Sequence, residues 1–299
     1  MIDSAINKEA ESFYRECIVA LERCHAAFLI GGAYGFRHYT SIYRSTKDLD
    51  IFVRPKDVEH TLNVLSDRGY KTEIIYTAWL AKAYYKDFFV DIIFRSGNGL
   101  AEVDDVWFTE ARTGTILQEE CLICPPEETI WSKAFTMERE RYDMADIVHL
   151  IQSCGETLDW DRLVYRFGEH WRVLLTYLIL FGYIYPGHQQ CIPKSVMKAL
   201  LRKLNNEIST MDIQSVDEAD LCKGTLLSGS QFLFDLLVRG YRDARFTGSV
   251  NMPENELRQW AQQLDDELDY RLQLASIELP PAIEKNNQAK PNDGAAVSY

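Results

Sequence analysis

The chain has 299 residues, 46% of them hydrophobic, with a formal net charge of -13 and a sequence pI of about 5.0. This length and composition fit one large or two ordinary domains with a proper hydrophobic core. The acidic balance argues against a broad nucleic-acid-binding surface, because such a surface neutralises phosphates with Lys and Arg. A local basic groove is compatible with it, so the charge favours a small-molecule or protein partner without excluding a nucleic acid.

The cysteines and the N-terminus predict a reduced, cytoplasmic protein. The seven cysteines are scattered and odd in number, and residues 1–5 contain neither a basic nor an apolar signal region. Cys121 and Cys124 have metal-like spacing, but no second pair lies nearby, so we interpret them as small strand residues. The apolar run over 173–185 would span roughly 20 Å as a helix, short of a bilayer core of about 30 Å. It predicts a buried helix, and no membrane span is expected.

The first 124 residues show helical and strand patterns in alternation, followed by strands in series. Apolar positions at helical spacing predict a helix over 5–25, and a short buried strand over 25–30 ends at two glycines. The next expected elements are a strand over 48–53, a helix over 57–67 and strands over 71–76, 81–85, 88–94, 114–117 and 120–123. This order predicts an α+β (α/β-like) fold, a small mixed β-sheet with flanking helices.

The pattern becomes helical after Pro125 and Pro126. Helices are expected over 127–138, 144–152, 160–167, 171–183, 194–204, 230–238 and 254–274. We therefore predict a first domain over 1–124 and an α-helical domain over 125–279. From residue 280 the chain is polar and rich in Pro, Asn and Ala, without periodicity, which predicts a disordered tail over 280–299.

Two carboxylates open the strand over 48–53. Side chains alternate between the faces of a strand, so Asp48 and Asp50 share one face while Leu49 faces the core. Two carboxylates held side by side repel each other unless a cation lies between them. Mg²⁺ suits such an oxygen-only site, because it keeps waters and adds substrate phosphates. The pattern therefore indicates metal-assisted chemistry on a nucleotide.

A third acid, Asp91, lies inside the apolar strand over 88–94. A buried carboxylate is costly unless it is paired or bound to a metal. One interpretation is an ion pair with an Arg or Lys of a neighbouring strand. With Asp48 and Asp50 upstream, a metal site is favoured instead. Three carboxylates on adjacent strands can hold two Mg²⁺ ions about 3.5 to 4 Å apart, which supports in-line phosphoryl displacement.

The glycine pair Gly31-Gly32 directly follows the first strand. Glycine lets a backbone approach a ligand closely and adopt positive φ. Amides at a strand end that leads into a helix form an anion pocket for phosphates. The alternative is a plain tight turn, and the acids that follow favour the phosphate pocket.

The order Ile30-Gly31-Gly32, Asp48-x-Asp50 and Asp91 resembles the nucleotidyltransferase superfamily that includes DNA polymerase beta and the aminoglycoside nucleotidyltransferases. The resemblance covers roughly residues 26–95. It is closest to a Gly-Gly branch of bacterial stand-alone enzymes that includes abortive-infection-type toxin transferases. Two departures are a slightly longer spacer and Gly32, where many members have a phosphate-binding Ser.

The resemblance implies that residues 1–124 form a catalytic domain that moves an NMP from an NTP, such as ATP, to an acceptor hydroxyl and releases pyrophosphate. Asp48 and Asp50 would bridge two Mg²⁺ ions, for which Mn²⁺ could substitute. Asp91 would bind the catalytic ion and help to deprotonate the acceptor, and Gly31 and Gly32 would cradle the phosphates. A small-molecule or protein acceptor is expected in preference to tRNA.

Further candidates carry charge. Arg44 and Lys47 flank the Asp-x-Asp and could neutralise phosphate oxygens, or be solvated loop charges. Arg44 is preferred, because a guanidinium can bind phosphate bidentately. Lys133 could reach a phosphate, with Asp143 or Asp146 orienting it or the acceptor. The alternative for these two acids is an exposed helix with charges at i and i+3.

Two other functions are compatible with the pattern. The first is a non-catalytic nucleotide-binding or toxin–antitoxin interaction module on the same fold, against which the presence of all three acids argues. The second is a metal-dependent phosphohydrolase, but the His-Asp clusters common in such sites are missing from the sequence. The six histidines show no ligand spacing and are interpreted as structural or surface residues.

Overall fold

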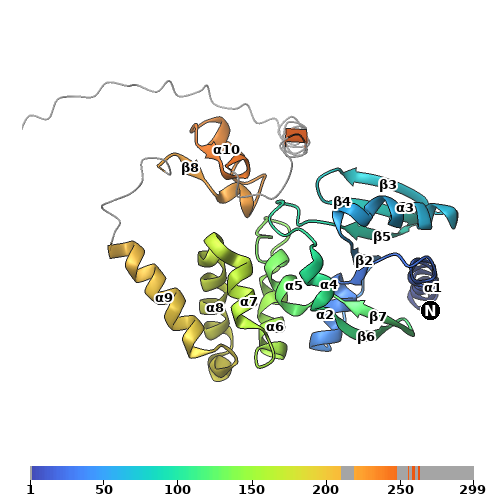
Figure 1. Ribbon diagram of the computed structural model, residues 1–299, viewed down its shortest axis with the longest axis horizontal. Helices are drawn as coiled ribbons and strands as arrows, with labels where there is room; N and C mark the ends of the chain where they lie inside the picture. Colours follow the sequence, from blue (N-terminus) through green and yellow to red (C-terminus); the bar gives the residue numbers. More distant parts are fainter. Residues whose placement is uncertain (1, 210–218, 248–254, 256–257, 260–261, 263–299) are drawn as a thin grey trace, which may run out of the picture.

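The computed structural model describes residues 2–209 and 219–247, together with 255, 258, 259 and 262 (Figure 1). The expected helix over 254–274 falls outside the described residues apart from those isolated positions, and the expected tail over 280–299 falls outside them entirely. The described chain is a mixed structure of helices and one large sheet, as the sequence predicts.

The described residues form a mixed seven-stranded sheet in the order β3-β4-β5-β2-β1-β7-β6. The strands are β1 (Leu29–Ile30), β2 (Asp48–Phe52), β3 (Lys71–Tyr76), β4 (Leu80–Tyr85), β5 (Phe88–Ile93), β6 (Arg112–Ile116) and β7 (Glu119–Ile123). Strand β2 is parallel to β5 and antiparallel to β1, and β1 is parallel to β7. The first strand is shorter than expected, because His25 has a positive φ of 54° and Ala26 still bonds back to Leu21.

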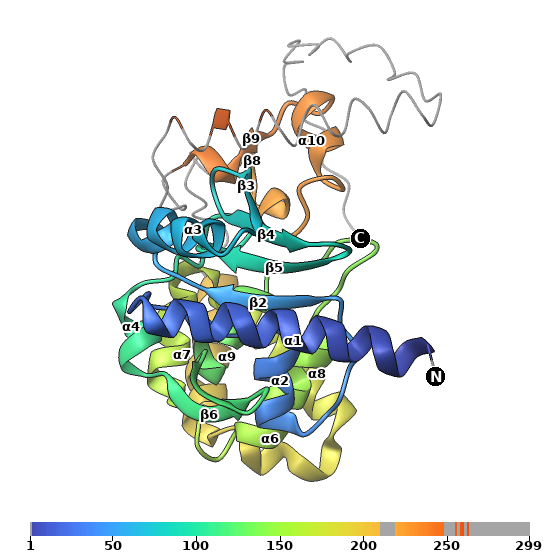
Figure 2. The same ribbon diagram turned by 90° about the vertical axis from the view of Figure 1, so that its right-hand side faces the viewer.

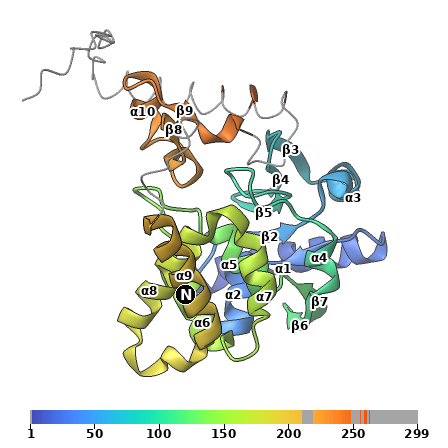
Figure 3. The same ribbon diagram turned by 60° about the vertical axis from the view of Figure 1, so that its left-hand side comes forward.

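Helices cover both faces of this sheet. They are α1 (Ile2–Arg23), α2 (Gly32–Thr40), α3 (Val58–Asp67), α4 (Asp105–Thr109), α5 (Pro126–Lys133), α6 (Met144–Cys154), α7 (Trp160–Phe167), α8 (Trp171–Ile184), α9 (Lys194–Ser209) and α10 (Leu233–Leu237). Helix α1 runs across one face (Figure 2). Helices α6 to α9 gather on the opposite side of the molecule from α1 and α3 (Figures 1 and 3). None of the helices in the described part of the chain combines the length and apolarity that a membrane crossing needs.

Two apolar cores result from this layering. One lies under α1 and α3 and contains Leu49 and Ile51 of β2. The other joins the opposite face to the later helices, so that Trp107 of α4 shares it with Ile147 of α6. Apolar contacts therefore continue across the expected boundary at residue 125, and the division into domains 1–124 and 125–279 stays a prediction.

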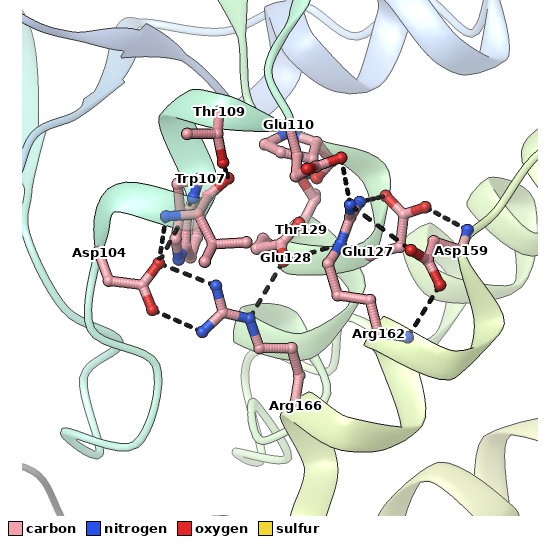
Figure 4. Close-up of polar contacts among 12 residues, drawn as sticks. Asp104, Trp107, Thr109, Glu110, Glu127, Glu128, Thr129, Asp159, Arg162 and Arg166 are labelled. Atoms are coloured by element: carbon pink, nitrogen blue, oxygen red, sulfur yellow. Dashed lines mark hydrogen bonds and ion pairs between the residues drawn. The ribbon is translucent and has the colours of Figure 1, made fainter.

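A buried ion network accompanies the second core (Figure 4). Glu127 and Glu128 of α5 are 1% and 0% exposed. Arg162 of α7 lies 2.7 Å from Glu127, and Arg166 lies 3.1 Å from Glu128. Arg166 also forms a bidentate contact with Asp104, which precedes α4, at 2.6 and 2.8 Å. The network thus fastens α7 to both α5 and α4.

Two helices differ from expectation. The helix expected over 127–138 ends at Lys133, because the next residues form a turn in which Met137 donates to Leu227 and bridges Tyr142. The helix expected over 230–238 is reduced to the five residues of α10. At the expected start of this helix, the Ser230 hydroxyl instead donates a hydrogen bond to the carboxylate of Glu138. The short strands β8 (Leu221–Cys222) and β9 (Arg242–Asp243) pair in parallel within the same segment.

Candidate active site

The three predicted acids lie together on the face of the sheet opposite α1. The parallel register of β2 and β5 places Asp50 directly beside Asp91. Each of Asp48, Asp50 and Asp91 offers a carboxylate oxygen, and these oxygens all lie within 4.8 Å of one another. The neighbouring Leu49 and Ile51 are fully buried on the other face, as the strand alternation predicts.

The electrostatics of this cluster are those of a site short of positive charge. Burial, and then the charges of Asp48 and Asp91, raise the pKa of Asp50 to about 7. Burial also raises the pKa of Asp91, although Lys82 opposes the shift. A set of carboxylate oxygens that crowd one another matches the donor chemistry of a hard divalent cation. The residues present therefore fit a Mg²⁺-type ion.

Asp91 forms an ion pair with Lys82 of a neighbouring strand, which is one of the two interpretations that the sequence allowed for this acid. The two residues face each other across β4 and β5, and Lys82 Nζ lies 2.7 Å from Asp91 Oδ1. The ammonium group also lies 3.8 Å from the centroid of the Phe89 ring. Asp91 is thus both a member of the acidic cluster and one half of an ion pair. Lys82 was not singled out in the sequence, where only the strand alternation could have placed it on this face.

The glycine pair packs directly against the acid strand. The Gly31 amide donates to the Asp50 carbonyl at 3.0 Å, and a Cβ on Gly31 would collide with the Phe52 ring. Gly32 has a φ of +53°, and a Cβ there would overlap the Asp50 carboxylate. Helix α2 begins at Gly32, next to the acids. Its first amides have no intrahelical partners, as at any helix start, and no side chain caps them. A residue with a Cβ, such as serine, does not fit at position 32 on this backbone.

A second charged cluster faces the first from the helical side. Lys133, at the end of α5, lies 2.8 Å from Asp143 and 2.9 Å from Asp146. Burial would raise the pKa of Asp143, but Lys133 and Arg141 outweigh it and lower the value. Asp146 is only 6% exposed, so the alternative of an exposed helix with charges at i and i+3 is wrong. Both acids hold Lys133.

Of the two flanking cations, Arg44 joins this second cluster. Its guanidinium binds Asp146 and lies 4.3 Å from the centroid of the Phe36 ring. Lys47 is exposed beside Asp48. Arg141 is a residue that the sequence analysis did not assign. It pairs with Asp143 at 3.2 Å while its side chain stays 68% exposed, and its charge opposes the rise in the pKa of Asp50. The signal for it was its place in the loop between Lys133 and Asp143.

A match to a protein family defines the class of protein to which the chain belongs. The family described as "Uncharacterised nucleotidyltransferase" matches residues 15–181, which is more than half of the chain. The chain belongs to this family of nucleotidyltransferase enzymes. The match includes the glycine pair, the three acids and the Lys133 cluster. It favours an enzyme over the non-catalytic interaction module. No curated protein sequence matches the chain.

Three solved structures resemble the fold weakly. The lincomycin-bound lincosamide antibiotic adenylyltransferase LnuA has 17% identity and a TM-score of 0.34, covering 47% of this chain and 94% of its own. The antibiotic-resistance factor ANT(2'')-Ia has 13% identity and a TM-score of 0.34, covering 69% and 96%. JHP933 from Helicobacter pylori has 13% identity and a TM-score of 0.32, also covering 69% and 96%.

Proposed function

We propose that this nucleotidyltransferase moves an NMP from a Mg²⁺-bound NTP, such as ATP, to a hydroxyl group of a small-molecule acceptor and releases pyrophosphate. The observation that supports it best is the convergence of Asp48, Asp50 and Asp91 beside the uncapped start of α2. Carboxylates next to free amides suit a substrate that brings both metal ions and phosphates. A protein acceptor is a second choice, and the net charge of -13 disfavours tRNA.

The three acids would hold two Mg²⁺ ions, for which Mn²⁺ can substitute. Such ions, when bound, polarise phosphoryl oxygens and neutralise the charge that develops during transfer. Asp91 is suited to take the proton of the acceptor hydroxyl, because its pKa is raised. The acceptor oxygen bonds to the α-phosphorus, the bond to the β-phosphate oxygen breaks, and its electron pair leaves with pyrophosphate.

The remaining residues would position the nucleotide. Gly31 and Gly32 leave room for phosphates, because neither carries a side chain beside the acids. Lys133 is fixed by two carboxylates, and its charge opposes the rise in the pKa of Asp50, so we assign it to a phosphate oxygen. The exposed guanidinium of Arg141 is placed to add positive charge beside the same phosphate. Asp143 and Asp146 are positioning residues that act through Lys133.

The test is pyrophosphate release from each NTP with a mixture of small-molecule acceptors. Asp48→Asn is expected to lower the rate at least about 100-fold, the scale on which single preorganised electrostatic groups act. The control is Asp67→Asn at the exposed end of α3, which removes the same charge elsewhere. Circular dichroism confirms that both variants fold. An unchanged rate in Asp48→Asn would refute the assigned role of the acids.

A further inference from the structure

Four charged side chains form a row across four strands of the sheet, and only two of them belong to the acidic cluster. The antiparallel registers place Glu73 of β3 opposite Lys82 of β4, and Lys82 opposite Asp91 of β5. The parallel register then places Asp91 beside Asp50 of β2. Residues paired directly across neighbouring strands share one face of a sheet. The face that carries the acids therefore presents an acid, a cation and two further acids in succession.

Lys82 is held at Asp91 by charge and by an aromatic ring. Its Nζ lies 2.7 Å from Asp91 Oδ1 and 3.8 Å from the centroid of the Phe89 ring. Oδ1 is buried and accepts no hydrogen bond from the residues that the structure describes, so the ammonium group neutralises this atom without hydrogen-bond geometry. The side chains of Lys82 and Asp91 are 19% and 15% exposed, so water screens their contact little.

A divalent ion and the Lys82 ammonium group compete for Asp91. Both are positive, and like charges on one carboxylate repel each other strongly in a site that water screens little. Asp48 and Asp50 have no such competitor, because neither forms an ion pair within the described part of the chain. The three acids are therefore not equivalent toward a metal ion.

Glu73 offers Lys82 a second position on the same face. Its side chain is 49% exposed, and its partner is Lys71, at 3.1 Å, whose side chain is 73% exposed. Exposed pairs of this kind add little stability, so Glu73 can exchange Lys71 for Lys82 at small cost. Residues directly opposite each other have Cβ atoms about 4.5–5.5 Å apart, which is within reach of a lysine side chain. Rotation about the side-chain bonds of Lys82 is enough to move its ammonium group from Asp91 to Glu73.

We propose that Lys82 is a positioning residue that occupies Asp91 until a divalent ion displaces it toward Glu73. The proposal rests on the proposed function for the role of the ion. Without nucleotide, Asp48 and Asp50 hold an ion while Lys82 keeps Asp91 neutralised. The ion that needs Asp91 binds when the phosphates of the NTP add their oxygens to its ligands. Lys82 thereby ties completion of the metal site to the arrival of the substrate.

The first experiment is a Mn²⁺ titration in which electron paramagnetic resonance counts free and bound ions in the absence of nucleotide. Lys82→Met removes the ammonium group and keeps an unbranched side chain against Phe89. It is expected to tighten Mn²⁺ binding at least about tenfold, the scale of one contact to a charged group. Lys82→Gln, neutral but polar, carries the same expectation, whereas Lys82→Arg keeps the charge and should bind like the wild type. The matched control is Lys198→Met on the exposed face of α9, which should also bind like the wild type.

The second experiment repeats the titration with a non-transferable α,β-methylene NTP and tests the position at Glu73. Glu73→Gln is expected to weaken Mn²⁺ binding in the presence of the analogue by about two- to fivefold, the scale of an exposed ion pair. Without the analogue it should bind Mn²⁺ like the wild type, because Lys82 then remains at Asp91. Glu59→Gln, exposed on α3, removes the same charge elsewhere and should change neither titration. Equal binding by Glu73→Gln and the wild type with the analogue overturns the displacement toward Glu73.

The outcomes separate this inference from the proposed function. Equal or weaker nucleotide-free Mn²⁺ binding in folded Lys82→Met and Lys82→Gln overturns the inference, because Lys82 would then not compete with the ion. If Lys82→Met tightens Mn²⁺ binding but the wild type releases no pyrophosphate from any NTP, the competition at Asp91 stands and the transfer reaction falls. If Asp48→Asn binds Mn²⁺ like the wild type, the proposed metal site falls and the inference falls with it.

Discussion

Two charge clusters lie on the helical side of the sheet, one buried and one half-buried, and they are built in opposite ways. In the network of Figure 4, the two buried glutamates Glu127 and Glu128 meet two arginines at 2.7 to 3.3 Å. In the acidic cluster of Asp48, Asp50 and Asp91, Lys82 forms an ion pair with Asp91 alone. Cations thus match the buried acids in the first cluster, whereas in the second cluster the half-buried acids outnumber the paired cation.

The difference separates a structural role from a functional one. Matched buried charges hold elements together, and removal of one partner strands the other in a medium of low dielectric constant. Unmatched acids weaken the fold by their repulsion and are relieved by a cation that arrives with the substrate. Asp50 shows this state directly, since its pKa is raised to about 7 by burial and by its two neighbours.

The largest expected effect comes from breaking the matched cluster. Glu128→Gln leaves Arg162 and Arg166 without the carboxylate that both contact, at a residue that is 0% exposed. We expect the free energy of unfolding to fall by about 3–5 kcal/mol, the usual cost of breaking a buried ion pair. Urea denaturation followed by circular dichroism measures it.

The matched control is Glu207→Gln, which breaks the exposed pair with Arg172 on the surface of α8 and α9. Exposed pairs contribute about 0–1 kcal/mol, so this variant should differ little from the wild type. A loss in Glu128→Gln as small as in the control would show that burial does not distinguish the two clusters.

How far the sequence predicts these clusters depends on the range of the contacts involved. Asp48, Asp50 and the buried Leu49 follow from strand alternation, and the glycine pair from its place at a strand end, because both patterns are local. To predict the role of Lys82, one would have to know that β4 pairs with β5 in the register that places Lys82 opposite Asp91. Such pairings depend on the whole sheet, and no neighbouring residue encodes them.

The same limit explains the errors in the helical half. The helix expected over 127–138 ends at Lys133, because the following loop is held by Leu227, which is distant in sequence. That turn returns the chain so that Asp143 reaches Lys133. The alternative of an exposed acidic helix failed for this reason, since helical periodicity describes one element and not what packs on it. The mixed sheet and most helices were predictable, because their apolar spacing is regular.

A second, smaller effect tests the unmatched cluster. Asp50→Asn removes a like charge from the three carboxylates, so the variant should be at least as stable as the wild type without divalent ions, while its transfer activity falls. Mg²⁺ should stabilise the wild type by up to about 2.7 kcal/mol at 100 times its dissociation constant. The same addition should leave the melting temperature of Asp50→Asn nearly unchanged.

Differential scanning fluorimetry with and without Mg²⁺ measures both parts of this prediction. Asp67→Asn, which removes an exposed carboxylate from the end of α3, should respond to Mg²⁺ like the wild type. A marked loss of stability in metal-free Asp50→Asn would mean that the acidic cluster is structural, and the contrast between the two clusters would disappear.

The smallest expected effect lies at the partly exposed edge of the matched network. Burial raises the pKa of Asp104, but Arg166 and the amides of Val106 and Trp107 outweigh it, so the folded value lies below the ordinary one. A group with a lowered folded pKa contributes stability above its unfolded pKa, and this contribution is lost as the pH falls through the folded value. Asp104→Asn should therefore be less stable than the wild type at pH 7, and the gap should close below about pH 4. Melting temperatures between pH 3 and 7 measure the gap, and a constant gap would place the contribution of Asp104 in its capping of α4 and not in its charge.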